Sequence, residues 1–185
     1  TLIDEVDPAI LNNITNIKIS KTFKPTLSSA LKYTIDFSNA LYNPHSGHMG
    51  STAGVTAGGI LSSTGFSLNA STETWYLEDD GAGIVKAYYV SGTSKVYQAA
   101  AVGTIDYTTG EVVLTKINIT AVSDVDGATS TSVRITVQPA SNDVVPVRNQ
   151  ILQIDSVNIS VTGTADTIAA GAGDAGVNYT TSATY

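Results

Sequence analysis

The chain has 185 residues, no cysteine, and 16 acidic against 9 basic side chains, so its formal net charge is −7. The lack of cysteine excludes disulfides and thiolate chemistry, and it removes the commonest ligands of structural zinc. A negative chain supplies few of the cations that release counterions from phosphate, so we expect no nucleic-acid partner. The sequence holds no run of about 18 apolar residues, so we expect no membrane partner.

The composition favours β-structure. The chain is rich in Thr, Val and Ile, whose branched side chains suit pleated, half-buried surfaces, and only 14% of its residues are charged. Turn signals recur at short intervals, and no long apolar stripe of helical period is present. We therefore expect an all-β, mainly antiparallel, sandwich-like fold with long surface loops and at most one or two short helices, the first beginning near Pro8.

Alternation of apolar and polar residues locates the strands. Leu31, Tyr33, Ile35 and Phe37 alternate with polar residues, which is the pattern of a strand with one buried face. Similar but shorter patterns predict further strands, in chain order, at 17–19, around 66, and at 75–77, 84–90, 117–122, 133–137, 151–154 and 157–161.

The segment 103–115 carries the clearest local signal. Apolar residues alternate at Ile105 and Tyr107 before a turn, and the alternation resumes after it at Val112. This pattern predicts a tight β-hairpin in which Gly110 adopts a positive φ.

Two stretches lack any strand pattern. Residues 43–64 are rich in Gly, Ser, Thr and Ala and predict a long surface loop, and the end of the chain is rich in Ala and Gly. We expect one mainly-β module at 1–164, with a sub-boundary near the 43–64 loop, and a loosely ordered tail at 165–185. Because the chain begins at Thr1 rather than Met, we expect a fragment or a processed product.

Few residue clusters could carry chemistry. His45 and His48 stand three apart, but a metal site would need a third ligand from elsewhere. The stretches 79–81 and 124–127 could offer oxygens to calcium, yet Asp-Gly is turn chemistry and neither continues into a dedicated calcium loop. The Gly-rich stretch 171–176 has too few residues after it for the helix that a dinucleotide site requires. We therefore expect no catalytic residue, no cofactor, no metal site and no small-molecule substrate.

Two adjacent aromatic pairs fall in predicted strands. Trp75, Tyr76, Tyr88 and Tyr89 could stack on sugars or bases. Alternation along a strand instead favours core packing for one member of each pair, with the other member facing out.

Four stretches, taken in order, carry a family resemblance. They are Tyr42 to His48, Leu77 to Gly81 running into Tyr88-Tyr89, the hairpin Gly103 to Gly110, and Ser141 to Leu152, which is the most specific. Together they resemble the C-terminal part of the ring-forming baseplate wedge protein, the gene-product-six type, of T-even-like and marine cyanobacterial myophages.

The resemblance implies a structural subunit of a contractile phage tail baseplate. Such a subunit joins other baseplate wedge proteins and its own copies, as a homodimer within a ring, and has no catalytic residues to transfer. It implies a place in the virion after assembly in the host cytoplasm.

The candidate structural or interface residues follow from the hairpin and the last stretch. In Ser141 to Gln150 we expect Asn142 or Asp143 to cap backbone amides, and Arg148 to anchor the connection or contact a partner. The full set is Tyr107, Gly110, Asn142, Asp143, Arg148 and Asn149.

The alternative is an extracellular bacterial adhesin or surface-layer type β-sandwich binding module. It would share the acidic, cysteine-free, Thr-rich composition. Such modules commonly bind calcium at Asp-rich turns, so calcium dependence would separate the two hypotheses.

Overall fold

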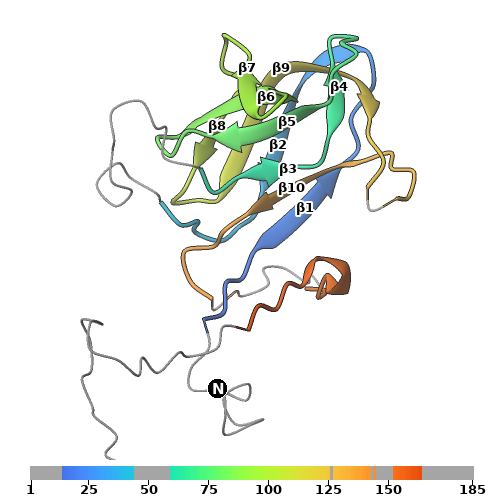
Figure 1. The fold of residues 1–185 in the computed structure, drawn as a ribbon. Coiled ribbons are helices and arrows are strands. Elements are labelled where there is room, and N and C mark those ends of the chain that lie inside the picture. Colours follow the sequence, from blue (N-terminus) through green and yellow to red (C-terminus); the bar gives the residue numbers. More distant parts are fainter. Residues whose placement is uncertain (1–13, 44–58, 126, 143, 145–151, 164–185) are drawn as a thin grey trace, which may run out of the picture. The chain divides into compact units, whose positions relative to one another are not determined.

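The structure is a computed structural model that describes residues 14–43, 59–125, 127–142, 144 and 152–163 (Figure 1). The chain separates into two units, Thr1–Asn149 and Gln150–Tyr185. No helix in these ranges is long and apolar enough to cross a membrane.

Two antiparallel sheets build the described part of the first unit. The smaller sheet has the order β1-β10-β3, and the larger has the order β2-β9-β4-β5-β6-β7, with β8 pairing with both β6 and β9. The expected all-β, antiparallel, sandwich-like fold is confirmed. The strands are β1 (Ile19–Phe23), β2 (Ser29–Asp36), β3 (Ser62–Ser63), β4 (Phe66–Leu68), β5 (Trp75–Asp79), β6 (Ile84–Ser91), β7 (Ser94–Tyr97), β8 (Gly103–Asp106), β9 (Glu111–Val122) and β10 (Val133–Val137).

The larger sheet curls back on itself. One edge of β9 pairs with β8 near its start and with β4 near its end. Strand β4 continues to β5, β5 to β6, and β6 to β8, so the hydrogen-bonded path returns to β9 (Figure 1). Closure of this kind removes free edges. It leaves β2 and β7 outside the closed path.

One apolar core lies inside this fold. Along β10 every second residue, Val133, Ile135 and Val137, is fully buried, and Phe66 and Ile119 of the larger sheet join the same cluster. Each such side chain stabilises the fold by about 1.5 to 3 kcal/mol relative to leaving it exposed. The other buried apolar residues are Ile35, Phe37, Leu41, Leu61, Leu68, Leu77, Val85, Ala87, Val102, Ile105, Val112, Leu114 and Ile117.

Strand β9 is a single strand of 12 residues where the sequence predicted two. Its register shifts opposite Lys32, where Thr115 and Lys116 face one residue of β2, and Lys116 has a φ of 51°. This is a β-bulge, which adds one residue and changes the phase of the alternation. Leu114 and Ile117 are therefore both buried although they stand three apart.

Several other expectations need correction. The strands expected at 151–154 and 157–161 are wrong, because the described residues 152–163 form only a 3₁₀ turn, η1 (Ser156–Asn158), and coil. Ile154 and Val161 are 80% and 90% exposed. The expected loop ends before 64, since Leu61 is buried and β3 follows it. The polar strands β3 and β7 were not predicted.

Some expectations fall on residues outside the described ranges. These are the short helix near Pro8, the loop residues 44–58 with both histidines, and the tail from 164 onward.

Candidate functional site

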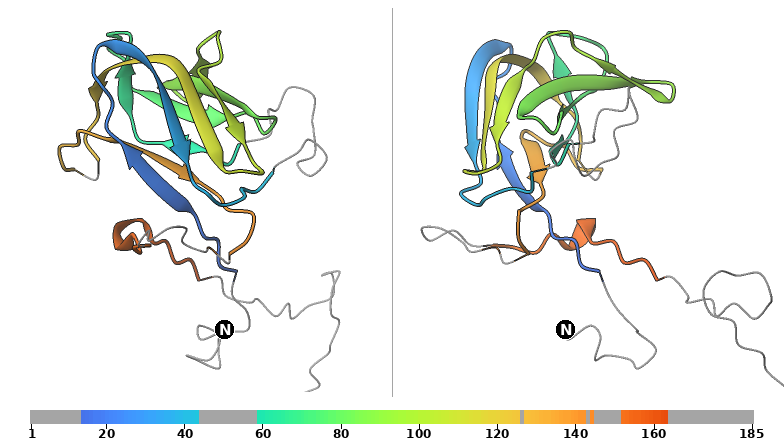
Figure 2. Two further views of the ribbon diagram at one scale, coloured as in Figure 1. Left: turned by 180° about the vertical axis from the view of Figure 1, so that it is seen from behind. Right: turned by 90° about the vertical axis from the view of Figure 1, so that its left-hand side faces the viewer.

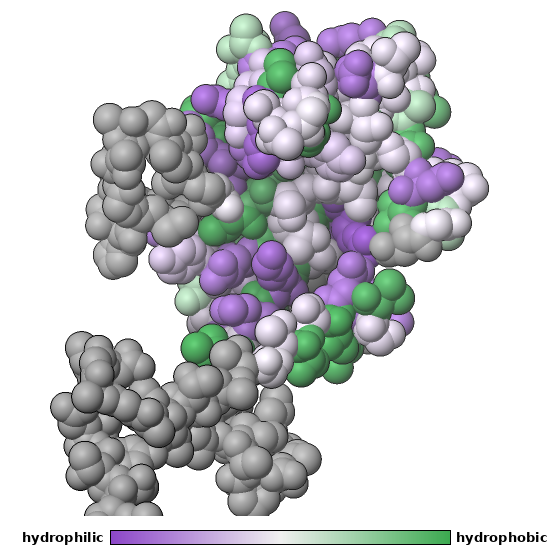
Figure 3. All heavy atoms as spheres, in the orientation of Figure 1, coloured by the Kyte–Doolittle hydropathy of each residue, from purple (hydrophilic) through white to green (hydrophobic). Residues whose placement is uncertain are grey.

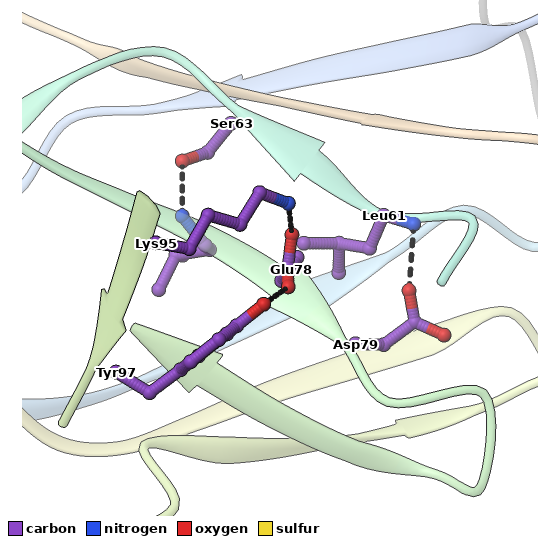
Figure 4. Close-up of polar contacts among 7 residues, drawn as sticks. Leu61, Ser63, Glu78, Asp79, Lys95 and Tyr97 are labelled. Atoms are coloured by element: carbon purple, nitrogen blue, oxygen red, sulfur yellow. Dashed lines mark hydrogen bonds and ion pairs between the residues drawn. The ribbon is translucent and has the colours of Figure 1, made fainter. Parts of the chain in front are cut away.

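A buried carboxylate, that of Asp79 at the end of β5, lies at the centre of a polar cluster. Asp79 is 2% exposed. Its Oδ1 accepts a hydrogen bond from Leu61 N at 2.8 Å (Figure 4). Its Oδ2 accepts from the Tyr107 hydroxyl at 2.6 Å and from Gly81 N at 3.3 Å. A carboxylate is tolerated in the interior only when its oxygens are satisfied in this way. We call Leu61, Asp79, Gly81 and Tyr107 the Asp79 brace.

The tyrosine of the brace is held as a hydrogen-bond donor. Its hydroxyl also accepts from Gly83 N at 3.3 Å. Burial raises the pKa of Tyr107, and the hydrogen bond to Asp79 raises the pKa further. Tyr107 therefore stays protonated well above neutral pH and keeps donating to Asp79.

The turn that follows Tyr107 is ordered by its own polar groups. Asp106 Oδ1 accepts from Thr108 N at 2.8 Å and from Thr109 N at 3.2 Å, and these amides lower the pKa of Asp106. Gly110 N donates to Asp106 O at 2.9 Å. Gly110 has a φ of 80°, which confirms the predicted turn.

The same turn lies against the segment that follows β2. Gly110 O accepts from Phe37 N at 2.9 Å, and Tyr107 O accepts from Leu41 N at 2.7 Å. A Cβ built on Gly110 would lie 2.2 Å from Asn39 O. The turn thus requires glycine both for its backbone conformation and for this close approach.

The candidate residues divide into two groups. Tyr107 and Gly110 come together in one turn, with Tyr107 in the brace. Asn142 lies in another part of the first unit, and its Nδ2 donates to Thr15 O at 3.2 Å. The cap expected from Asn142 or Asp143 stays a prediction. Asp143, Arg148 and Asn149 lie outside the described residues, and their roles stay predictions.

Three tyrosines from adjacent strands form a row on the outer face of the sheet. Tyr76, Tyr88 and Tyr97 pair across β5, β6 and β7, with ring centroids 5.7 Å apart in both contacts. On the opposite face Trp75 packs against the core and meets Tyr89 edge-on at 4.9 Å. The predicted alternation is present, but none of the four residues of the predicted pairs is fully buried.

Glu78 of β5 contacts two side chains of β7 beside the tyrosine row (Figure 4). Its carboxylate forms an ion pair with Lys95 and accepts a hydrogen bond from the Tyr97 hydroxyl. The Lys95 ammonium also lies 4.4 Å from the Tyr88 ring centroid, a cation–π contact. Two side chains of β7 thus reach across β6, and the β6–β7 hairpin extends as a green arm in the right-hand view of Figure 2.

Replacing Glu78 by Gln should move the titration of Tyr97. Burial, and then the hydrogen bond to Glu78, raise the pKa of Tyr97 from 10.0 to about 12. Because the pKa is higher in the folded chain, protonated Tyr97 stabilises the fold. This stabilisation is complete below pH 10 and is lost as the pH rises through about 12. In Glu78→Gln we expect the tyrosinate absorbance of Tyr97 to develop at lower pH, nearer 10. The matched control is Glu73→Gln, an exposed acid, and an unchanged titration in Glu78→Gln would show that burial alone sets the pKa.

A pocket of about 150 Å³ lies beside the tyrosine row. Its lining residues are Glu78, Asp79, Asp80, Lys86, Tyr97, Gln98 and Ala99. Its carboxylates are engaged within the fold, since Asp80 Oδ1 accepts from Ala82 N at 2.8 Å and from Ile84 N at 3.0 Å. Asp79-Asp80-Gly81 is therefore turn chemistry, as expected. Among the described residues no group of three His, Cys, Asp or Glu side chains is placed to hold a metal ion.

The polar groups of the Asp79 brace and those around Glu78 stabilise the fold by connecting its strands. The brace connects β5 with the segments before β3 and after β8, and Glu78 connects β5 with β7. Comparison with known protein families, curated proteins and solved structures found no match to this chain.

Proposed function

We propose that this chain is a structural subunit of a contractile phage tail baseplate, which joins neighbouring wedge proteins and its own copies in a ring through protein–protein interfaces. It acts without catalysis, cofactor or small-molecule substrate. Its place is the virion, after assembly in the host cytoplasm. The assignment to a baseplate rests on the four stretches that resemble the wedge protein.

The Asp79 brace is the observation that carries a structural role. Two of the four resembling stretches supply three of its four residues, one with Asp79 and Gly81 and the other with Tyr107. A catalytic carboxylate must leave an oxygen accessible to substrate. Asp79 instead is buried and accepts from three donors of its own chain. The resembling residues thus stabilise the module, and recognition is left to its surface.

The mixture of polar and apolar side chains on the surface supports association with partners that fold separately. The face drawn in Figure 3 carries purple and white side chains with green patches between them, the most extended at the lower right. Interfaces between separately folded proteins are about as apolar as the rest of a protein surface. A subunit that is added to a ring needs such a mixed surface.

The direct test is to locate the chain in a particle. An epitope tag on the gene that encodes this chain, followed by immunogold electron microscopy of purified contractile-tailed particles, should label the baseplate end of the tail. Label on bacterial cell surfaces and none on tails would overturn the proposal.

A second measurement separates the proposal from the adhesin or surface-layer alternative. We expect the same melting temperature with calcium and with a chelator, because the role proposed here requires no cation. A melting temperature that falls on chelation and recovers with calcium would favour the extracellular module.

A further inference from the structure

Strand β7 ends the larger sheet, and no described strand pairs with its outer edge. Its residues Ser94, Lys95, Val96 and Tyr97 are all exposed. The hairpin with β6 turns at Gly92, which has a φ of 62°. An exposed edge of this kind is a template for pairing with another strand.

The register of the hairpin determines which backbone groups face outward. Ser94 pairs with Ser91 across a two-residue turn, and Val96 pairs with Tyr89. Residues that flank such a turn form a hydrogen-bonded pair, and every second residue after them does the same. Gln98 N donates to Ala87 O at 2.8 Å, in step with this alternation. The amides and carbonyls of Lys95 and Tyr97 therefore point away from β6.

This edge lacks the usual protection against pairing. Lysine side chains, prolines and bulges normally block edge strands. The one charged residue of β7 is Lys95, and its ammonium is drawn back onto Glu78 and Tyr88.

The other long edges are better protected. Strand β2 contains Lys32 beside the register shift of its pairing, and Lys21 of β1 donates to the Asp36 carbonyl of β2. Strand β1 is flanked by Lys18 and Lys24. Edge pairing is thus most favourable at β7.

We propose that a second copy of this chain pairs with β7 in antiparallel fashion, about a two-fold axis at Val96. In this register Lys95 of each copy lies opposite Tyr97 of the other copy. All outward amides and carbonyls of both residues are then hydrogen bonded. The two Val96 side chains meet in the close, non-hydrogen-bonded position, and each lysine lies beside an aromatic ring.

Other symmetric registers are less favourable. The axis is perpendicular to the sheet, so residues that face each other lie on the same side of it. An axis at Lys95 would place two ammonium groups opposite each other, which is destabilising. An axis at Tyr97 or Ser94 would leave outward groups of β7 without a partner strand.

Local charge also favours a second copy at this position. Each chain has a net charge of −7, so most faces of two copies repel each other. The hairpin 84–97 carries Lys86 and Lys95 and no acid, and Glu78 offsets one of these charges. The repulsion between copies is therefore weakest here. This inference rests on the proposed function, for which it supplies the surface between two copies.

Charge substitutions at the axis test the register. Sedimentation equilibrium of the 185-residue chain should show a dimer with a Kd on the order of micromolar. Val96→Glu and Val96→Lys should each weaken it about tenfold or more, because like charges then meet at the axis. A mixture of the two variants should dimerise again. The control is Leu27→Glu, which makes a similar change at an exposed apolar residue outside the β6–β7 hairpin and should dimerise as the native chain does.

A cysteine gives a test that does not depend on charge. Non-hydrogen-bonded pairs have Cα atoms about 4.5 Å apart, within the range of about 4.4 to 6.8 Å that a disulfide spans. The native chain has no cysteine, so Val96→Cys should form one covalent dimer on mild oxidation, and Val90→Cys should not.

The outcomes distinguish this inference from the proposed function. A native dimer that Val96→Glu leaves intact, or a Val96→Cys chain that does not cross-link, overturns pairing at β7 while leaving a ring subunit with another interface. A native chain that stays monomeric at high concentration overturns the pairing as well. Gold label absent from the tail would overturn the baseplate assignment, whatever the dimer shows.

Discussion

Replacing Gly110 by Ala should lower the free energy of unfolding by roughly 2 to 5 kcal/mol. A left-handed backbone costs alanine about 1 to 2 kcal/mol, and overpacking adds about 1 to 3 kcal/mol. Gly110 has a φ of 80°, and its new Cβ would lie 2.2 Å from Asn39 O, a backbone atom that cannot rotate away. Urea unfolding followed by circular dichroism measures the loss.

Gly127 provides the matched control. Its φ is 76°, and nothing lies within 4 Å of a Cβ built on it. Gly127→Ala should therefore lose only the backbone contribution, about 1 to 2 kcal/mol. Equal losses in the two variants would show that the approach of Asn39 to the hairpin turn contributes nothing.

Removing the carboxylate of Asp79 should be comparably severe. Asp79→Ala leaves the Leu61 amide and the Tyr107 hydroxyl without their acceptor, and we expect the free energy of unfolding to fall by roughly 3 to 5 kcal/mol. Asp79→Asn retains one oxygen acceptor and should lose about half as much. Asp124→Ala, at an exposed acid, should change stability by less than about 0.5 kcal/mol.

A double-mutant cycle isolates the tyrosine contact. Tyr107→Phe alone removes one donor, and in the Asp79→Ala background the same change should be nearly neutral because the acceptor is already gone. Additive losses in the cycle would mean that the 2.6 Å contact contributes little and that Asp79 stabilises the fold through Leu61 and Gly81.

Local sequence signals predicted the local features of this fold. The 103–115 hairpin, the positive φ of Gly110 and the strands at 31–37 and 133–137 depend on neighbours in the chain, and alternation with turn chemistry reveals them. The sequence predicted two strands in place of β9 because the bulge changes the phase of the alternation. No residue type marks a bulge at Lys116.

The missed features depend on partners distant in sequence. Asp79 and Tyr107 are 28 residues apart, so Asp79-Asp80-Gly81 by itself indicates only a turn. Strand β7 has one apolar aliphatic residue, Val96, and is held by its pairing with β6 and by Glu78. The signal for it was the Ser91-Gly92-Thr93-Ser94 turn, which closes a two-residue hairpin. Conversely, the alternation at 152–161 had no strand to pair with in the described ranges.

The closed path of strands divides the sheet into parts that open at different free energies. Strand β9 is hydrogen bonded to β2 on one edge and to β4 and β8 on the other, so its amides become accessible to solvent only when most of the sheet has separated. Strand β7 is bonded to β6 alone and can open without disturbing the closed path. Hydrogen exchange should therefore be slowest along β9, near the rate of global unfolding. In the dilute monomer, among the described strands, it should be fastest at the outward amides of Lys95 and Tyr97, and pairing with a second copy should slow it there.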